Sequence, residues 1–409
     1  MSKITIIDSP MGSGKTTWAI NNVLNNDLTG NCIYITPFLS EVSRVVQETS
    51  NHKRFIAPEN KGEGKLAAIN RLLSKGNDIV ATHELFKHLN DESKRYVKDF
   101  HYTLLLDEVL DVIAPYNIKS GDLRLLLDGE WIFIDDEGFV VWNHEKSDKD
   151  STFAEIKTLA DGRNLICVNN TMLLWRYPPE IFYMFDEIYI LTYLFEASIL
   201  CAYFKYNNIQ YDKKSIRIKN DCNYPIKYEL EDYKPFDASV FSSLINIYEG
   251  SLNFNISKRQ TSLSKQWFKN TEHNKDIKKL KNNIYNYLHN IQKAKSDTIM
   301  WTCFKSDTDK LKGSGYSSSY VPCNCRSTND YHQKYNLVYA VNRYINPGVI
   351  QYFANKDIKF NNDLYALSEM IQWIWRSRIR TGNTINIYIP AIRMRLLLKR
   401  WLSGRLPES

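Results

Sequence analysis

The sequence predicts an α/β protein with two parallel-sheet units in tandem. Unbroken apolar runs alternate with helical segments through the first 206 residues, which is the pattern of a parallel sheet covered by helices on both faces. A glycine-rich loop follows the first apolar run, and strands and helices alternate again after residue 298. Because 409 residues suffice for two domains, we expect one unit at residues 1–206 and another at residues 207–409.

The glycine-rich loop has the sequence of a phosphate-binding loop, except that Ser9 stands where the first Gly is usual. It lies between an apolar run at residues 4–7 and a helical segment at 18–24. Glycines let backbone N–H groups turn toward phosphate oxygens, and the next helix directs its positive end at the same place. We expect Lys15 at the β- and γ-phosphates and the Thr16 hydroxyl on Mg²⁺. The predicted nucleotide-binding residues are Pro10, Met11, Gly12, Ser13, Gly14, Lys15, Thr16 and Thr17.

Further elements of the first unit follow in order. Strands are predicted at residues 32–37, 79–83, 103–109 and 188–194, and helices at 39–46, 67–73 and 197–206. Apolar segments at residues 131–134 and 139–142 flank an acidic turn with glycine, which predicts a β-hairpin. We expect this hairpin to lie in an insertion at about residues 123–145, which either contacts nucleic acid or has no role in the function.

Composition shifts toward Lys, Asn and Tyr after residue 206, at the start of the second unit, and a basic segment follows later in it. Residues 257–295 hold ten Lys and Arg against two acidic residues. Helical spacing of Ile277, Leu280, Ile284, Leu288 and Ile291 predicts a basic amphipathic helix, whose Lys face is either solvated or in contact with DNA. Strands are then predicted at residues 298–304, 319–322 and 384–390, and helices at 337–344, 364–374 and 392–402.

Composition narrows the class of partner. A formal charge of +7 and a pI near 8.8 suit an anionic partner such as nucleic acid. The seven Cys are odd in number and lack the paired spacing of a metal site, which predicts reduced thiols. The sequence has neither an apolar run of about 18 residues nor a signal-peptide pattern, so we expect a cytoplasmic protein that does not contact a membrane.

Polar residues lie at the ends of three predicted strands. Asp107 would hold Mg²⁺, and Glu108 would orient and deprotonate an attacking water. In a parallel sheet the ligand crevice lies outside these strand ends, where hydroxyls and backbone N–H groups suit phosphate contacts. The residues in such positions are Thr36, Pro37, Thr82 and His83, for which plain turn chemistry is the alternative.

An arginine-rich segment at residues 372–380 reads QWIWRSRIR. Three arginines at alternate positions cannot share one face of a helix, so at least one of them is available for a pocket. An arginine delivered from a second domain stabilises the charge that develops on a γ-phosphate. A generic basic surface is the alternative, because residues 373–409 hold eight Lys and Arg and one Glu.

Together these segments resemble the superfamily 2 helicases of the DEAD/DEAH-like group, in particular compact helicases encoded by phages of Gram-positive hosts. SPMGSGKT resembles motif I, YITP motif Ia, ATHE motif Ic and LLLDEVL motif II. ILTYLFE resembles the strand of motif III, MWTCFK motif IV and QWIWRSR motif VI. The resemblance covers most of the chain and implies two RecA-like domains, with ATP between them and a nucleic-acid strand across both. Many helicases also have a small non-glycine residue where this chain has Ser9.

The resemblance assigns roles residue by residue. It implies that Glu108 is the catalytic base, Gln372 the γ-phosphate sensor, Arg376 or Arg378 the arginine finger, and Thr192 the residue that couples the two activities. It implies that Thr36 and Thr82 contact the sugar-phosphate backbone. Motif VI departs from the family, because Trp375 replaces the usual Gly, and motif V is represented only by residues 325–329.

The expected function is therefore that of an ATP-dependent DNA helicase or translocase in phage replication or recombination. The expected cofactors are ATP and Mg²⁺. The expected partners are single-stranded or forked DNA, with RNA as an alternative, and a replication protein; the sequence leaves the oligomeric state open. Two other functions share the loop and the carboxylates: an ATP-switched DNA- or origin-binding protein, and a terminase-like packaging ATPase. A phage-encoded protein of this kind would work in the cytoplasm of the bacterial host.

Overall fold

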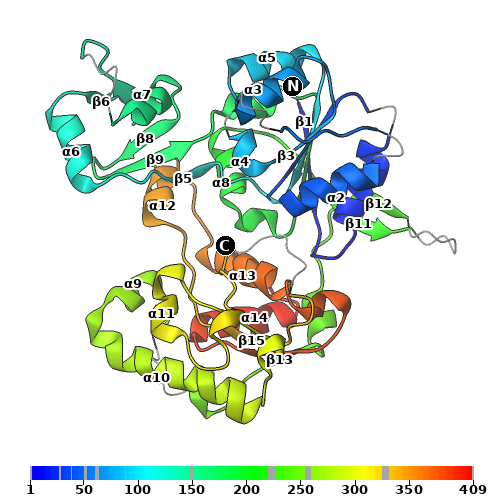
Figure 1. The fold of residues 1–409 in the computed structure, drawn as a ribbon, viewed down its shortest axis with the longest axis vertical. Coiled ribbons are helices and arrows are strands. Elements are labelled where there is room, and N and C mark those ends of the chain that lie inside the picture. Colours follow the sequence, from blue (N-terminus) through cyan, green and yellow to red (C-terminus); the bar gives the residue numbers. More distant parts are fainter. Residues whose placement is uncertain are drawn as a thin grey trace.

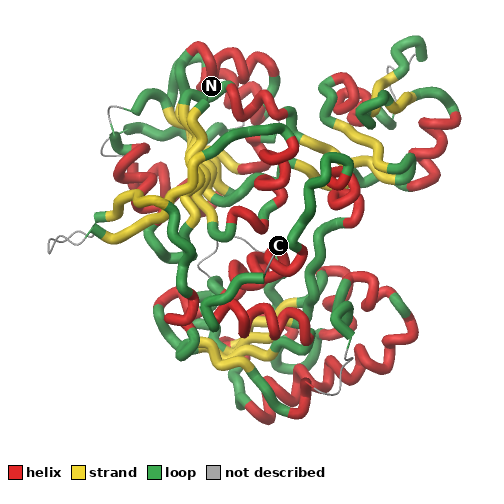
Figure 2. Tube along the Cα trace, turned by 180° about the vertical axis from the view of Figure 1, so that it is seen from behind, coloured by secondary structure: helices red, strands yellow, loops and turns green. Residues whose placement is uncertain are grey.

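A computed structural model describes residues 2–26, 29–37, 39–49, 53–59, 64–87, 89–146, 152–219, 227–253, 259–324 and 331–407. It consists of two α/β units, and a smaller insertion projects from the first of them (Figures 1 and 2). The predicted α/β class with two parallel sheets is thereby confirmed. No helix among these residues is long and apolar enough to cross a bilayer.

The first unit is built on a seven-stranded sheet in the order β12-β11-β1-β10-β4-β2-β3. All neighbours pair in parallel except β11 with β12. The register pairs Asp8 with Thr192, Leu191 with Asp107 and Thr36 with Thr82, so the predicted polar strand ends share one edge of the sheet. The strands are β1 (Lys3–Asp8), β2 (Cys32–Thr36), β3 (Ile79–Thr82), β4 (Thr103–Asp107), β10 (Glu187–Thr192), β11 (Asp212–Ile218) and β12 (Tyr228–Asp232).

Both faces of this sheet are buried, which explains the unbroken apolar runs. Ile6 and Leu106 belong to one hydrophobic cluster, whereas their neighbours Ile7 and Leu105 belong to a second cluster on the opposite face. The helices that pack around the sheet are α1 (Lys15–Ala19), which continues as a π-helical segment Ile20–Leu24, α2 (Leu39–Thr49), α3 (Lys65–Leu73), α4 (His83–Phe86), α5 (Asp91–Asp99) and α8 (Ile199–Tyr206).

The first sheet continues beyond the predicted boundary at residues 206 and 207. Strand β11 pairs with β1, and β12 closes that edge as an antiparallel strand, so the sheet ends only at Asp232. Most β11 and β12 residues are partly or fully exposed, as expected at a sheet edge. The shift toward Lys, Asn and Tyr after residue 207 therefore marks this edge hairpin as well as the approach to the second unit.

The predicted hairpin is confirmed, but the insertion that carries it is larger than residues 123–145. Strands β6 (Ile132–Ile134) and β7 (Val140–Trp142) form the hairpin. It packs on a three-stranded antiparallel sheet of β5 (Ile113–Pro115), β9 (Met172–Arg176) and β8 (Leu165–Val168). Helices α6 (Ser120–Asp128) and α7 (Ala154–Asp161) complete a small domain with its own hydrophobic cluster.

The second unit has a four-stranded parallel sheet in the order β13-β16-β15-β14. Its strands are β13 (Ile245–Ile247), β14 (Ile299–Thr302), β15 (Asn336–Tyr339) and β16 (Ile385–Tyr388). Its helices are α9 (Lys265–Lys269), α10 (Asn274–Tyr285), α11 (Thr308–Leu311), α12 (Pro347–Ala354), α13 (Asn362–Ile374) and α14 (Ile392–Leu402). Figure 1 shows this unit below the first, with the C-terminus near the junction between them.

Three predictions for the second unit need correction. The helix predicted at residues 337–344 is strand β15, whose four residues are all buried because the sheet is covered on both faces. The strand predicted at residues 319–322 is a single bridge between Trp301 and Tyr320. The basic helix α10 is confirmed, but Ile291 is 46% exposed, because the helix turns π-helical from Asn286 and the spacing shifts.

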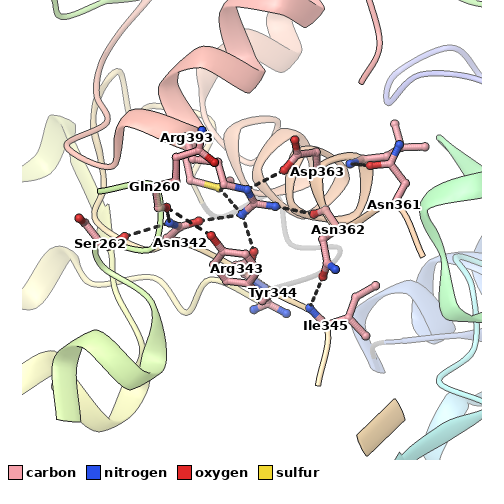
Figure 3. A network of polar contacts seen from close by, with 12 residues as sticks. Gln260, Ser262, Asn342, Arg343, Tyr344, Ile345, Asn361, Asn362, Asp363 and Arg393 are labelled. Atoms are coloured by element: carbon pink, nitrogen blue, oxygen red, sulfur yellow. Dashed lines mark hydrogen bonds and ion pairs between the residues drawn. The ribbon is translucent and has the colours of Figure 1, made fainter. Parts of the chain in front are cut away.

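An arm of the second unit, residues 343–362, reaches the first unit. Helix α12 packs against α8 and the sheet of the insertion, and Arg176 donates to the Tyr352 hydroxyl over 3.2 Å. The base of the arm is fixed by the buried Arg393, shown in Figure 3. Its guanidinium bonds Asp363 Oδ1 at 2.6 Å, Asn342 Oδ1 at 2.8 Å, and the carbonyl oxygens of Arg343 and Asn362 at 2.9 and 2.7 Å. Both ends of the arm are therefore held by one side chain.

Candidate nucleotide site

The predicted phosphate-binding loop leaves the end of β1 and enters α1. Gly12 and Gly14 have φ values of 80° and 90°, in the left-handed region that favours glycine. The loop curls around the Lys15 ammonium, which donates to the carbonyl oxygens of Ser9 and Pro10, the latter at 2.9 Å. Burial lowers the pKa of Lys15, against the opposing effects of Glu108, Asp8 and Asp107.

The side chain of Ser9 makes a hydrogen bond that a glycine at this position could not make. Its hydroxyl accepts a hydrogen bond from the Ile216 backbone N–H at 2.8 Å, and its own N–H donates to Thr192 O at 3.0 Å. Strand β1 pairs with β11 only as far as Ile7 and Lys214. The Ser9 side chain therefore holds β11 beside the loop, beyond the last residues at which β1 and β11 pair.

The predicted carboxylates lie beside the loop. Burial and the neighbouring Glu108 carboxylate raise the pKa of Asp107 to about 7, while the Tyr34 hydroxyl acts in the opposite direction. Glu108 has a φ of 72°, which is rare for a residue with a side chain, and its N–H donates to Leu191 O at 2.9 Å. Backbone strain of this kind is concentrated at functional sites.

A cavity of about 390 Å³ brings residues of both units together. The first unit supplies most of the phosphate-binding loop, the two carboxylates and three charged side chains of α2, whereas the second unit supplies the end of the arginine-rich segment. The lining residues are Met11, Gly12, Gly14, Lys15, Thr16, Thr17, Glu41, Arg44, Glu48, Asp107, Glu108, Tyr228, Trp375, Arg376 and Arg380. Met11 also packs against the hydrophobic core of the second unit.

The three arginines of the segment at residues 372–380 point to different places. Arg376 and Arg380 line the cavity, and Arg380 is near enough to Lys15 to lower its pKa further. Arg378, predicted as a possible finger, lies elsewhere: its Nε donates to Thr384 O at 2.6 Å and its guanidinium stacks 3.9 Å from the Tyr335 ring centroid. Arg380 was missed, although its spacing of four from Arg376 indicates the same face of a helical turn.

Trp375, which replaces the glycine of motif VI, belongs to the core. It is 3% exposed and packs edge to face against Phe241 and Trp401, with centroids 4.8 and 5.6 Å apart. The side chain therefore fixes the segment from which Arg376 extends. This contact explains why a large residue is accommodated at that position.

Gln372 lies in a neighbouring cavity of about 340 Å³ and does not line the cavity of the phosphate-binding loop. Its amide donates to Ser368 Oγ at 3.5 Å. Thr192, Pro37 and His83 line the same second cavity. Gln372, the predicted γ-phosphate sensor, therefore shares a cavity with Thr192, the predicted coupling residue, and not with the phosphate-binding loop.

The residues predicted to contact nucleic acid have mostly local roles in this structure. Thr36 is completely buried, and no hydrogen-bond partner of its hydroxyl is found among the described residues. Thr82 caps α4 by accepting from Leu85 N at 3.4 Å, and His83 Nε2 lies 3.1 Å from Asp107 O. Pro37 and His83 line the second cavity, where Glu84, Asp111 and Glu369 also lie. The motif V residues 325–329 lie outside the described part of the chain.

The insertion carries an excess of acidic residues. Residues 113–176 hold eleven Asp and Glu against seven Lys and Arg, although the whole chain is basic. The hairpin turn itself contains Asp135, Asp136 and Glu137. In the structure, Arg163 pairs with Asp135 and Glu137 at 3.2 and 2.8 Å, so part of this negative charge is neutralised within the insertion.

One ion pair beside the loop, between the buried Asp8 and the partly buried Lys213, was not predicted. The Asp8 carboxylate accepts from the N–H groups of Leu194 and Phe195 at 2.8 and 3.0 Å. Lys213 on β11 approaches Asp8 at 3.1 Å, and Asp8 and Glu196 raise its pKa despite burial. Asp8 therefore holds the turn after β10 against the start of the loop. An acidic residue at the end of β1 was the only signal in the sequence.

Comparison with known proteins gives the same division of the chain. A family model described as the YonV middle domain matches residues 113–175, which are β5 to β9, and one described as the YonV C-terminal Rossmann-like domain matches residues 239–402. The chain is 40% identical over 414 residues to "SPbeta prophage-derived uncharacterized protein YonV" of Bacillus subtilis (strain 168), covering 99% of this chain and 100% of that protein. This chain belongs to the YonV family.

Proposed function

We propose that this protein is an ATP-dependent DNA helicase or translocase, with two RecA-like domains of the superfamily 2 type that close on ATP. One observation carries the proposal: a single cavity contains the phosphate-binding loop with Lys15, the carboxylates Asp107 and Glu108, and Arg376 and Arg380 from the other unit. Hydrolysis of a phosphoanhydride needs these groups together, because its catalysis consists of positioning and charge stabilisation.

The charges of the cavity suit a triphosphate. The Lys15 ammonium would exchange two backbone carbonyl oxygens for phosphate oxygens, which are stronger partners for a cation. Arg376 and Arg380 would neutralise charge that develops on the γ-phosphate, and Glu108 would orient the attacking water. Because the arginines belong to the second unit, nucleotide would hold both units together.

The residues also fit Mg²⁺. Asp107 and Glu108 are adjacent, half-buried carboxylates, and desolvation together with the Glu108 charge raises the pKa of Asp107 to about 7. A bound cation would favour the ionised form of both carboxylates. Asp107 and the Thr16 hydroxyl would hold the ion together with phosphate oxygens, as is usual for Mg²⁺. The ion would supply further neutralisation of the phosphate charge.

Contacts between the units support coupling to movement. Trp401 of α14 donates to the Tyr193 hydroxyl at 3.0 Å, directly after β10, and Gln372 shares a cavity with Thr192. If phosphate binding moved the second unit, these residues would transmit the movement to the end of β10. The relative from a prophage supports phage DNA as the track, and the exposed Lys275, Lys278 and Lys279 on α10 offer a basic surface for it.

An ATPase assay with and without single-stranded DNA tests the proposal. DNA should raise turnover several-fold, and Lys15→Ala should abolish turnover. Strand displacement from a forked duplex would then separate unwinding from translocation alone. If DNA leaves turnover unchanged while ATP tightens DNA binding, the protein is an ATP-switched DNA-binding protein. Duplex cleavage with Mn²⁺ that survives Lys15→Ala would favour a packaging motor.

A further inference from the structure

Tyr228 is the first residue of strand β12 and lies over the phosphate-binding loop. A Cβ atom added at Gly14 would come within 2.2 Å of its Cε1 and 2.4 Å of its Cζ, so the edge of the ring rests directly on the loop backbone. Gly14 is therefore required twice, for its φ of 90° and for the space that Tyr228 fills. Tyr228 is half-buried and lines the cavity that contains Lys15 and Asp107.

The hairpin that carries Tyr228 is attached to the loop. Ser9 accepts from Ile216 N on β11 at 2.8 Å, and Ile216 pairs with Leu230 on β12. Ile216, Tyr228 and Leu230 pack on the hydrophobic cluster that includes Trp18 of α1. The position of the ring is therefore fixed relative to the phosphate-binding groups.

The polar groups of the cavity and its aromatic groups are suited to different parts of a nucleotide. Lys15, Thr16 and the arginines of the second unit suit phosphates. Among the described residues, two aromatic side chains line the cavity, Tyr228 and Trp375, and Trp375 is 3% exposed and already packed on Phe241 and Trp401. Tyr228 is the one with accessible surface, and aromatic rings bind nucleobases by stacking.

We propose that Tyr228 is the base-binding residue of the nucleotide site, stacking on the nucleobase of a bound purine nucleoside triphosphate. The inference rests on the proposed function, since it takes for granted that the loop binds phosphates. It adds that affinity depends on the base, and that this part of the site is supplied by the edge hairpin β11–β12. Stacking by one aromatic ring is worth roughly a five-fold to hundred-fold change in affinity.

Calorimetric titration of the full chain with Mg²⁺·ATP and with Mg²⁺·tripolyphosphate tests this inference. Tyr228→Ala should weaken ATP binding roughly ten-fold or more and leave tripolyphosphate binding within about two-fold. Tyr228→Phe keeps the ring and should bind ATP as the wild type does. Leu230→Ala is the matched control, because Leu230 belongs to the same strand and cluster but does not line the cavity. Photolabelling with 8-azido-ATP should modify the peptide that contains Tyr228.

Three results would overturn the inference. If Tyr228→Ala binds ATP as tightly as the wild type, the ring does not contact the base. If the same variant loses ATP and tripolyphosphate equally, Tyr228 supports the loop and not the base. If the wild type binds tripolyphosphate and ATP equally well, the cavity binds phosphates and has no base-binding site. A wild type that binds neither would overturn the proposed function as well.

Discussion

The hydroxyl of Ser9 accepts a hydrogen bond from the backbone N–H of Ile216 at 2.8 Å. This contact joins the first residue of the phosphate-binding loop to a strand more than two hundred positions later in the chain. It gives a physical reason for the serine where a glycine is usual, independent of any resemblance to helicases. The residue that departs from the motif is the residue that attaches the edge hairpin.

Ser9→Gly restores the usual first residue of the motif, and we expect it to destabilise the protein. The variant leaves the Ile216 N–H without its acceptor, at a cost of about 1–2 kcal/mol in the free energy of unfolding. Denaturant unfolding measures this cost, and hydrogen exchange should quicken at residues 215–217. Equal stability and equal exchange in both proteins would contradict the role assigned to Ser9.

Removal of the arginines one at a time should divide them into two classes. Arg376→Ala and Arg380→Ala remove cations from the cavity and should lower ATP turnover at least about a hundred-fold. Arg378→Ala is the matched control, because its guanidinium is bound to Thr384 and Tyr335, and turnover should stay within about two-fold. Melting temperatures check that each variant is folded. Loss of turnover in Arg378→Ala alone would contradict the placement.

Strands β1 to β4 and β10 of the first sheet could be predicted because their signals are local. An apolar strand, two glycines and a helix identify the loop around Lys15, and the run that ends in Asp107 identifies the next functional strand. The helix at residues 337–344 was predicted wrongly because a short, fully buried apolar run has no periodicity that separates strand from helix. Its neighbours β14 and β16 decide that it is a strand, and they are distant in sequence.

The rest of the site depends on contacts that no local pattern records. Tyr228 reaches Gly14 only because β12 is the outer edge of the first sheet, and Lys213 reaches Asp8 only because β11 pairs with β1. Thr36 lies at the end of a strand as predicted, yet it is buried because β2 is an inner strand of the sheet. The strand order of the sheet therefore decides which polar residues at its edge are accessible.

The raised pKa of Asp107 predicts a pH-dependent stability. In the unfolded chain this carboxyl ionises near pH 3.8, but in the folded protein only near pH 7. Its ionisation therefore costs folding free energy, a cost that grows from about pH 4 and is complete above pH 7. Asp107→Asn removes the cost, so without nucleotide its melting temperature should exceed that of the wild type at pH 8 and approach it near pH 4.5. A difference that is the same at both pH values would contradict the assignment.

Arg393 should be required for the arm to keep its place. Arg393→Met removes the guanidinium from Asp363, Asn342 and two backbone carbonyls, and we expect a loss of about 3 kcal/mol in the free energy of unfolding. Arg400→Met on the exposed face of α14 is the matched control and should change stability by no more than about 0.5 kcal/mol. Hydrogen exchange should also quicken across α12 in the first variant. Unchanged exchange there would show that the arm is held by its contacts with the first unit alone.

Thr36→Val tests whether Thr36 has a structural role or contacts nucleic acid. The Thr36 hydroxyl is buried, and no partner for it is found in the described ranges, so its replacement by a methyl group removes a polar group that folding desolvates without compensation. We expect the melting temperature to stay equal or to rise, with DNA affinity within about two-fold of the wild type. Thr82→Val is the comparison, because it removes the cap of α4 and should cost about 1 kcal/mol. If Thr36→Val weakens DNA binding while its melting temperature is unchanged, the end of β2 opens to nucleic acid and the role implied by motif Ia is correct.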